Sequence, residues 1–523
     1  MTAFVAGETQ HGASRPRLAL AVAAWQILFL LLLLARALAT PIDYDEEQYV
    51  AAGVMARHLM LYRDFIYLQG PGDPLLLAGL FSLTGGWYLL AARLLSWALA
   101  VCLFGLTTAL LRRFGLGRGF SAALATVALL SPCLAVAVST ARNDILPLAL
   151  FLAGLLLYLD AGQKAQPARW LAISGLLIGL AVEAKVSYVF APVALLLHGF
   201  WVSRDRFRHL APLVAGIAVA ALPGLCYLAL APEQAWYDLL EYHRTAPFLW
   251  YQGQGQAELL TGEHRLLVLV FLLGWGSNGT LALLLIGLGG ARLFPGGREP
   301  APPIPARGLL LLLIALAAIT AFQPSPSWPM YYAPLVPLLA ALAASLFMTT
   351  RLPAPPALVP LLLAIAAVPA LPPLWSMATS LPEQMQPALW PGVQVHRQAA
   401  EIRDTLQAAG LQGEVATLFP THALDANPVP AEFASGPFFF RTAGPIPAPR
   451  IAALHGASAE TLEDLFERDP PAAILGGLAP GQWSVEMDAS LEAYAQRHQY
   501  RKVALAPELW PKGSWLYLRD AEH

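Results

Sequence analysis

Long apolar stretches separated by short polar ones recur along the first 376 residues. A stretch of about twenty apolar residues is what a membrane-spanning helix requires. The composition agrees, because 57% of the residues are hydrophobic and 13% are charged, whereas a soluble domain carries about 25% charged residues. The pattern predicts about eleven spans, near residues 18–39, 87–110, 120–140, 145–160, 169–183, 186–201, 210–230, 266–289, 308–322, 332–348 and 356–376. We expect the first to be retained as a membrane span rather than removed as a signal peptide.

Basic residues gather in alternate connections between the predicted spans, and such connections mark the cytoplasmic side of a membrane. The other connections, 40–86, 141–144, 231–265 and 323–331, are then external, as is everything after residue 376. The basic residues that support this orientation are Arg15, Arg17, Arg112, Arg113, Arg118, Lys164, Arg169, Arg204, Arg206, Arg208, Arg292, Arg298, Arg307 and Arg351.

Residues 377–523 have a different pattern, with more charge and no apolar stretch long enough to span. Strands are predicted at 414–419, 472–476, 503–505 and 514–519, and helices at 394–409 and 490–498. The sequence therefore predicts an α-helical polytopic membrane protein over residues 1–376, followed by a small extracytoplasmic α/β domain over 377–523.

Charge and cysteine content exclude some function classes. The net charge is -2, so the chain has no overall basic character of the kind that indicates a nucleic-acid partner. The three cysteines all fall inside apolar stretches, which favours neither a disulfide framework nor a zinc site.

The first external connection opens on an acidic run, Asp43, Asp45, Glu46 and Glu47, directly after the first predicted span. Carboxylates avoid lipid, so they lie at a membrane surface or in a cavity. One interpretation is structural: Asp43 with Glu46, or Asp45 with Gln48, has the spacing of a capping box. The other interpretation is a reaction site, and both roles can coexist.

Two short helices are predicted within this connection. Apolar residues at helical spacing over 46–62 indicate a helix lying on the membrane surface, apolar face down. Residues 64–74 interrupt it. The apolar stretch 75–83 is too short to span and predicts a second interfacial or re-entrant helix.

Two further external features carry charge. Arg142 and Asp144 lie in the link between the third and fourth spans, where a simple polar turn is the alternative. Lys185 lies between two short spans whose other ends are cytoplasmic, so it sits at or below an external turn. Ionisable groups at membrane depth usually serve a site or pair with each other. The alternatives for Lys185 are a pair with Glu183 and snorkelling to the surface.

These groups suit an anionic lipid-linked substrate such as a sugar on a prenyl phosphate. Transfer needs a carboxylate to take the proton of the attacking hydroxyl. It also needs cations, or a divalent metal, to hold the charge that develops on the departing phosphate. A single displacement of this kind inverts the anomeric centre.

The order of motifs resembles the polytopic C-superfamily glycosyltransferases, the group of the protein O-mannosyltransferases and the lipid A aminoarabinose transferase. The resemblance covers about residues 18–376. It rests on Asp45-Glu46-Glu47-Gln48-Tyr49, Pro71-Gly72-Asp73-Pro74, Gly86-Trp87, Ala92-Arg93-Leu94, Arg142-Asn143-Asp144, 175–181 ahead of Lys185, and 328–334. The sequence departs from the family in its extra glutamate and in Gly72-Asp73, which interrupts the paired prolines often found there.

The resemblance implies that the acidic motif holds the catalytic base and that later external residues bind lipid phosphate. We expect Asp45 to be the base, Glu46 or Asp144 to orient the acceptor or a metal, and Glu47 to point to water. The expected phosphate-binding residues are Lys185, Arg142, His243, Arg244, Tyr331 and Tyr332.

The sequence thus predicts a membrane glycosyltransferase, hexosyl or pentosyl, using a prenyl-phosphate-linked donor and a lipid, glycan or protein acceptor. The bias to Arg over Lys, with much Ala and Pro, indicates a GC-rich genome and a bacterial inner membrane. A lipid-linked sugar flippase or transporter is the alternative, although no internal repeat of the kind typical of transporters is evident. A structural scaffold would need none of these charged groups.

Overall fold

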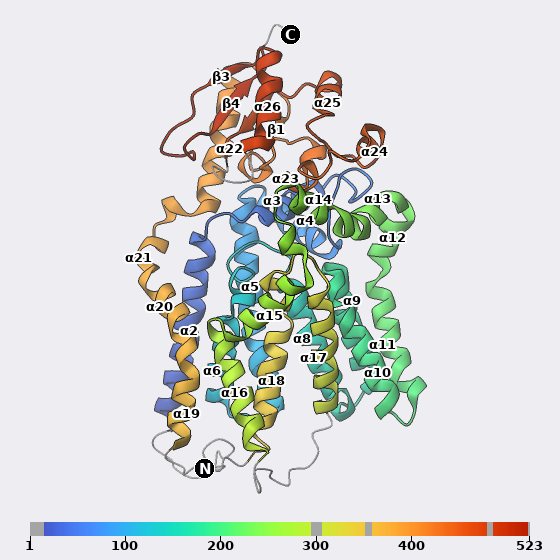
Figure 1. Cartoon of the computed structure of the whole chain (residues 1–523), viewed down its shortest axis with the longest axis vertical. Helices are drawn as coiled ribbons and strands as arrows, with labels where there is room; N and C mark the ends of the chain where they lie inside the picture. Colours follow the sequence, from blue (N-terminus) through green and yellow to red (C-terminus); the bar gives the residue numbers. More distant parts are fainter. Residues whose placement is uncertain (1–14, 294–305, 351–357, 479–484, 521–523) are drawn as a thin grey trace.

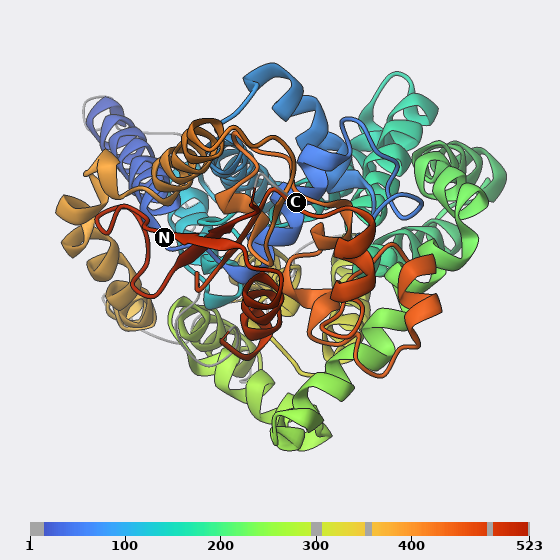
Figure 2. The same ribbon diagram turned by 90° about the horizontal axis from the view of Figure 1, so that it is seen from above.

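A computed structural model describes residues 15–293, 306–350, 358–478 and 485–520 of the chain. Long helices run side by side, and a small unit with a sheet lies on one end of them (Figure 1). Seen from above in Figure 2, this unit lies over the helical part rather than beside it. The predicted combination of a helical membrane part and a small α/β unit is confirmed.

Four helices are long and apolar enough to cross a membrane, and two bent helix pairs raise the number to six among the described residues. This is a multi-pass membrane protein. The four are α2 (Arg15–Ala39), α5 (Tyr88–Arg113), α8 (Ile145–Asp160, continued by η1, Ala161–Gln163) and α9 (Pro167–Ala184). The pairs are α11 (Arg206–Ala220) with α12 (Leu222–Leu230), bent by 45°, and α15 (Gly262–Gly274) with α16 (Ser277–Ala291), bent by 82°.

The other predicted spans contain shorter helices, so the number eleven stays a prediction. A helix of 12 residues such as α6 (Arg118–Leu129) is about 18 Å long, well short of a hydrocarbon core of about 30 Å. The predicted span 120–140 is broken where α6 ends and α7 (Pro132–Ala135) begins with a proline at its start. The remaining short helices are η2 (Val186–Val189), α10 (Phe190–Val202), α17 (Ala306–Phe322), η5 (Pro329–Tyr332), α18 (Leu335–Phe347), α19 (Leu358–Ala367), η6 (Val368–Ala370) and α20 (Leu371–Thr379).

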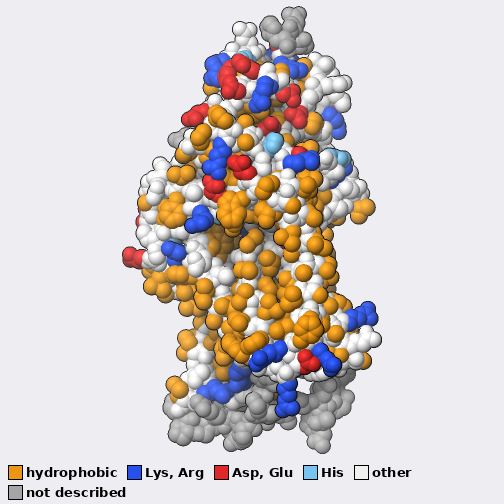
Figure 3. All heavy atoms as spheres, turned by 90° about the vertical axis from the view of Figure 1, so that its right-hand side faces the viewer, with side chains coloured by type: hydrophobic (Ala, Val, Ile, Leu, Met, Phe, Trp, Pro, Cys, Tyr) orange, Lys and Arg blue, Asp and Glu red, His pale blue; other side chains and the backbone are white. Residues whose placement is uncertain are grey.

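The surface of the helical part matches a membrane environment. Figure 3 shows many hydrophobic side chains over the face of the helical part in view, with Lys and Arg gathered at its end away from the α/β unit. Arg112 and Arg113 close α5 and Arg118 opens α6 near this end. Among the predicted cytoplasmic residues, Arg298 and Arg351 and the side chains of Arg15 and Arg17 lie outside the described part of the chain.

Glycines bring α9 and α11 into backbone contact. A Cβ atom on Gly175 would lie 2.1 Å from the carbonyl oxygen of Leu213, and one on Gly216 would lie 2.0 Å from that of Ala172. Small residues at helix crossings allow such close packing in membranes. The packing fixes α9, and Lys185 directly follows the last residue of α9.

The first external connection forms α3 (Tyr44–Met55) and α4 (Gly72–Thr84). α3 ends seven residues before the predicted end at Tyr62, which itself adopts φ 65° in a tight turn. The Glu46, Glu47 and Gln48 side chains of α3 are all buried, so other parts of the chain cover its polar face, and its position along the membrane surface stays a prediction. The connection 231–265, which was predicted to be external, contains α13 (Pro232–Trp236), a π-helical turn η3 (Tyr237–Glu241), α14 (Tyr242–Gly253) and η4 (Ala257–Leu260).

The C-terminal unit contains a four-stranded sheet in the order β1-β2-β4-β3. β1 and β2 are parallel, while β4 runs antiparallel to both of its neighbours. The strands β1 (Val415–Ala416), β2 (Ala473–Gly476) and β4 (Trp515–Leu518) lie within the predicted ranges, whereas β3 (Arg501–Val503) overlaps the predicted 503–505 only at Val503. The two predicted helices are α22 (Pro391–Ala408) and α26 (Val485–Arg497). Short helices that were not predicted are α21 (Leu381–Gln384), η7 (Pro387–Leu389), η8 (Pro420–His422), η9 (Ala431–Phe433), α23 (Pro437–Phe440), α24 (Ala448–Ala453) and α25 (Leu462–Arg468).

Candidate active site

The acidic run begins α3 with a complete capping box. The Oδ1 atom of Asp43 accepts a hydrogen bond from the backbone N–H of Asp45 at 3.0 Å. The backbone N–H of Asp43 donates to Oε2 of Glu46 at 2.9 Å. The structural interpretation of Asp43 and Glu46 is therefore confirmed, and it fixes Asp45 in the first turn of the helix.

Glu46 connects the start of α3 to Arg93 of α5 and to Ala141. Its carboxylate is fully buried and accepts hydrogen bonds from Nε and Nη2 of Arg93 at 2.9 and 2.7 Å, and from the backbone N–H of Ala141 at 2.7 Å. Arg93 also donates to the carbonyl oxygens of Ala37 and Thr40 at the end of α2. Both oxygens of Glu46 are thus occupied, so this arrangement leaves Glu46 without a free lone pair directed at a substrate.

Arg142 lies at the centre of a charged cluster formed with the carboxylates of Asp43, Asp45 and Asp144. Its Nη1 atom is 2.8 Å from Asp43, its Nε atom is 3.0 Å from Asp144, and its Nη2 atom pairs with Asp45. Lys185 pairs with the other oxygen of Asp144. The side chain of Asp45 is 22% exposed and that of Lys185 14%, against 2% for Asp144. The side chain of Asp43 is 31% exposed, so Asp43, Asp45 and Lys185 are the members that a substrate can reach.

Backbone packing brings Lys185 to this cluster. Asn143 donates through Nδ2 to the carbonyl oxygen of Ala184 at 3.3 Å. Cβ atoms on Gly70 and Gly72 would lie 2.1 Å from the Glu183 carbonyl oxygen and 2.8 Å from the Ala184 nitrogen, so only glycine allows this approach. The suggested pair of Glu183 with Lys185 is not formed, since Glu183 accepts from the backbone N–H of Gly224 at 2.9 Å.

The surroundings shift the pKa values of two carboxyl groups in the cluster in opposite directions: that of Asp144 is lowered and that of Asp45 is raised. Although burial opposes it, pairing with Lys185 and Arg142 lowers the pKa of Asp144 to about 2. Burial raises the pKa of Asp45, which Arg142 opposes and the nearby Asp43 and Asp144 reinforce. Asp144 therefore stays ionised and holds the two cations, whereas Asp45 has the higher proton affinity that a general base requires.

Asp73, at the start of α4, was not assigned a role from the sequence. Its side chain is buried. Burial raises its pKa to about 7, with Asp144 adding to the shift and Lys185 opposing it. The signal in the sequence was Gly72-Asp73, which replaces the paired prolines often found there. In the structure, Asp73 lies close enough to Lys185 for this cation to act on its pKa.

The other predicted phosphate-binding residues divide into two groups. The ring of Tyr331 lies 5.9 Å from Nζ of Lys185, so this tyrosine is at the cluster. The hydroxyl of Tyr332 instead bonds to that of Ser327 at 3.1 Å. Nε2 of His243 lies 2.6 Å from the carbonyl oxygen of Leu68, and Arg244 is exposed on α14.

Glu47 does not point to water as expected. It is 1% exposed, and its Oε2 atom accepts hydrogen bonds from the backbone N–H of Thr421 at 3.0 Å and from its hydroxyl at 2.6 Å. Burial raises the pKa of Glu47 to about 8, although the two bonds from Thr421 lower it. The expectation failed because the C-terminal unit covers this side of α3.

Metal ligands and cavities add two observations. Within the described residues, no three His, Cys, Asp or Glu side chains are grouped to hold a metal ion.

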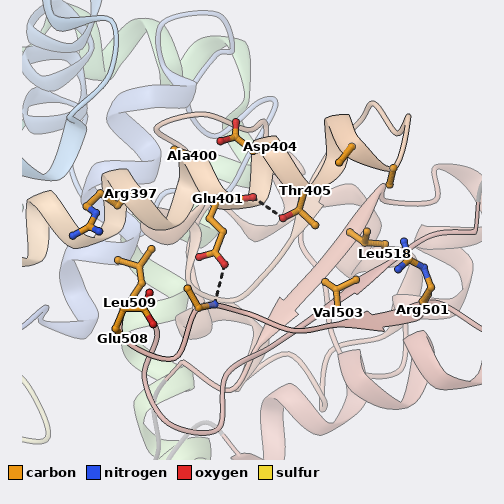
Figure 4. Close-up of a pocket in the computed structure, with 13 residues that line it drawn as sticks. Arg397, Ala400, Glu401, Asp404, Thr405, Arg501, Val503, Glu508, Leu509 and Leu518 are labelled. Atoms are coloured by element: carbon orange, nitrogen blue, oxygen red, sulfur yellow. Dashed lines mark hydrogen bonds between the residues drawn. The ribbon is translucent and has the colours of Figure 1, made fainter.

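A groove of about 780 Å³ opens between α22 and the edge strand β3 of the C-terminal unit (Figure 4). Its Glu401 is already bonded to the backbone N–H of Ala506 and to Nε1 of Trp510. No lining residue comes from the membrane part, so the groove is separate from the charged cluster.

Comparisons with known proteins agree with this arrangement. The sequence profile of Glycosyltransferase family 87 matches residues 70–317, a little under half of the chain. The crystal structure of ArnT from Cupriavidus metallidurans bound to undecaprenyl phosphate is similar, with 14% identity, a TM-score of 0.56, and coverage of 97% of this chain and 98% of that one. Its apo form gives 13% identity, a TM-score of 0.57, and coverage of 95% and 98%. No curated protein sequence matches the chain. At such identities the likeness establishes a shared fold.

Proposed function

We propose that this chain, which has the fold of the polytopic C-superfamily glycosyltransferases, moves a sugar from a prenyl-phosphate donor to an acceptor hydroxyl. The observation that carries the proposal is the cluster of Arg142, Asp144 and Lys185 beside Asp45. It places two cations and an accessible carboxylate within one small site. The undecaprenyl phosphate bound by ArnT supports a donor of the same class.

Each member of the cluster has a separate part in the reaction. Lys185, with Tyr331 beside it, faces the donor phosphate, and Arg142 supplies further positive charge. Asp144 fixes both cations, so that little reorganisation is needed as charge develops on the phosphate. Glu46 keeps α3 in place, and His243, Arg244 and Tyr332 are left with supporting roles at most.

The step is a single displacement. The carboxylate of Asp45 takes the acceptor hydroxyl proton while the acceptor oxygen bonds to the anomeric carbon. The bond from that carbon to the phosphate oxygen breaks on the opposite face, and its electron pair leaves with the phosphate. The anomeric centre is inverted, and the sugar is a hexose or a pentose. The acceptor is a lipid, glycan or protein.

We place the reaction outside the cytoplasm, at a bacterial inner membrane, because α3 and the C-terminal unit lie at the end of the bundle opposite the basic one. A fused reporter that is active only in the cytoplasm should stay silent after His523. Activity of that reporter would contradict both the orientation and the external site.

The transfer itself is tested with the purified protein in detergent, supplied with prenyl-phosphate sugars and candidate acceptor extracts. Release of free prenyl phosphate together with a glycosylated product supports the proposal. Movement of labelled donor across vesicle membranes without any product would instead identify a flippase. Analysis of the product's anomeric configuration by nuclear magnetic resonance tests the inversion.

A further inference from the structure

The helix that carries Asp45 is held from two sides. Successive residues of an α-helix are about 100° apart, so Asp45 and Glu47 point in nearly opposite directions. Asp45 pairs with Arg142 of the membrane part, whereas Glu47 bonds to Thr421 of the C-terminal unit, 374 positions later in the chain. Because α3 has only 12 residues, contacts on both faces set its rotation and therefore the direction of Asp45.

The contact around Glu47 is close and buried. A Cβ atom on Gly436 would lie 3.1 Å from that of Glu47, and the rings of Tyr44 and Phe419 are 6.0 Å apart. Nε2 of His422 lies 3.9 Å from Oε1 of Glu47. The first turn of α3 is thus enclosed by residues 419–436.

The contact continues into the core of the C-terminal unit. Nδ1 of His422 lies 2.7 Å from Oε1 of Gln398 on α22, and Nε2 of Gln398 donates to the carbonyl oxygen of Leu509 at 2.8 Å. His422 is buried as well, and burial lowers its pKa to about 4, so it is neutral near pH 7. Glu47 is therefore hydrogen-bonded to Thr421, and the neighbouring His422 is hydrogen-bonded through Gln398 into the core of the unit.

A second attachment of the same unit leaves α3 untouched. Asp425 accepts a hydrogen bond from the backbone N–H of Tyr88, at the start of α5, at 2.9 Å. Its other oxygen lies 2.8 Å from Nδ1 of His396, whose ring stacks on that of Trp87 at 3.6 Å. This attachment holds the unit to the membrane part and provides a matched control for the contact at Glu47.

We infer that Glu47 is a positioning residue, through which the C-terminal unit fixes the orientation of Asp45 for catalysis by way of Thr421. The inference rests on the proposed transfer reaction. Glu47 touches no substrate and acts only through α3. Since a displacement of about 1 Å can cost roughly a hundredfold in rate, loss of this contact should affect the chemical step more than donor binding.

The test compares Glu47→Ala, Thr421→Val and Asp425→Ala in the full chain, with kcat and the donor KM measured for each. We expect Glu47→Ala and Thr421→Val to lower kcat roughly tenfold, with the donor KM changed less than about twofold. The double variant should be little worse than either single one, because the two side chains form one contact. Asp425→Ala combined with Glu47→Ala should instead be additive.

Thr421→Ser provides the rescue. It keeps the hydroxyl that donates to Glu47, so kcat should return to near the wild-type value, whereas a fold that fails for reasons of packing would not be restored. The kcat of the wild type should also fall as pH rises past about 8, where Glu47 ionises close to Glu46, Tyr44 and the neutral ring of His422. The Glu47→Gln variant should lack that decline.

Three outcomes overturn the inference: unchanged kcat in both Glu47→Ala and Thr421→Val, an equal loss in Asp425→Ala, or the same alkaline decline in Glu47→Gln as in the wild type. An equal loss would mean that any loosening of the C-terminal unit is harmful. Absence of transfer by the wild-type protein is a different result, because it contradicts the proposed function itself.

Discussion

The two faces of α3 contain carboxylates only two residues apart with opposite surroundings. Asp45 is partly exposed and adjoins Arg142, with Lys185 just beyond Asp144. Glu47 is buried against backbone and hydroxyl donors of Thr421, with a neutral imidazole beyond them. Cations beside an accessible carboxylate make a site for an anionic substrate. A carboxyl group closed in by hydrogen-bond donors instead makes a structural contact.

The contrast also explains the roles of their neighbours. On the membrane-facing side, Asp144 keeps a low pKa because two cations surround it, and it can hold them in place through a reaction cycle. On the other side, burial raises the pKa of Glu47 to about 8 and the side chain stays largely protonated near neutral pH. Asp45 and Glu47 belong to the same acidic run, so the difference between their surroundings comes from the segments that pack against each face of α3.

The largest effect is expected on the reactive face. Asp45→Asn should lower kcat by about a hundred- to ten-thousand-fold, because asparagine cannot accept the proton of the acceptor. Asp43→Asn is the control, since asparagine still caps a helix and a lost cap costs only about 1 kcal/mol. Near-normal turnover of Asp45→Asn, together with loss of activity in Asp43→Asn or Glu46→Gln, would assign the base elsewhere in the run.

The second-largest effect is expected at the buried ion pair between Arg93 and Glu46. Arg93→Met leaves the buried carboxylate of Glu46 without its cation, which should destabilise the protein by about 3–5 kcal/mol. The loss is measured as a lowered temperature of thermal unfolding in detergent. Adding Glu46→Gln to Arg93→Met removes the unpaired charge and should recover part of that loss. If the double variant is less stable than Arg93→Met alone, the buried charge is not the cause.

Lys185 should have a smaller effect, limited to donor binding. A charge-assisted hydrogen bond contributes about 1.5–3 kcal/mol, so Lys185→Met should weaken binding of prenyl phosphate roughly ten- to a hundredfold. Titration calorimetry or competition with labelled donor measures this change. Lys164→Met, an exposed lysine after α8, is the control and should bind as the wild type does. Equal binding by the two variants would remove Lys185 from the site.

The smallest expected effect concerns Asp73 and pH. Its pKa rises from 3.8 in the unfolded chain to about 7 in the folded one, so the protein binds this proton more tightly when folded. The stability that the proton contributes is complete below about pH 4 and is lost as pH rises through about 7. Asp73→Asn removes this loss, so its unfolding temperature relative to the wild type should be higher at pH 8 than at pH 5.5. A difference that stays constant between the two pH values would show that Asp73 does not titrate in this range.

Much of the fold could be predicted from local pattern. Apolar stretches located the helices, and short apolar runs near 472–476 and 514–519 located two adjacent strands of the C-terminal sheet. Predictions failed where a break depends on details of packing. The helix expected to reach Tyr62 ends at Met55, and the span expected over 120–140 is interrupted at Pro132. Periodicity shows which face of a segment is apolar, but it does not show where tertiary contacts stop a helix.

The sequence by itself determined which elements contain the candidate catalytic and phosphate-binding groups: an acidic helix start, an Arg-Asn-Asp link and a lysine after a membrane helix. Only the tertiary structure decided which partner each charge has. Glu46 and Glu47 are neighbours in the chain, yet one bonds to Arg93, 47 positions away, and the other to Thr421, 374 positions away. Residue type and spacing are local properties, whereas burial and the distance between charges depend on how distant segments pack. The role of each carboxylate in this run is therefore fixed by the fold and not by its place in the motif.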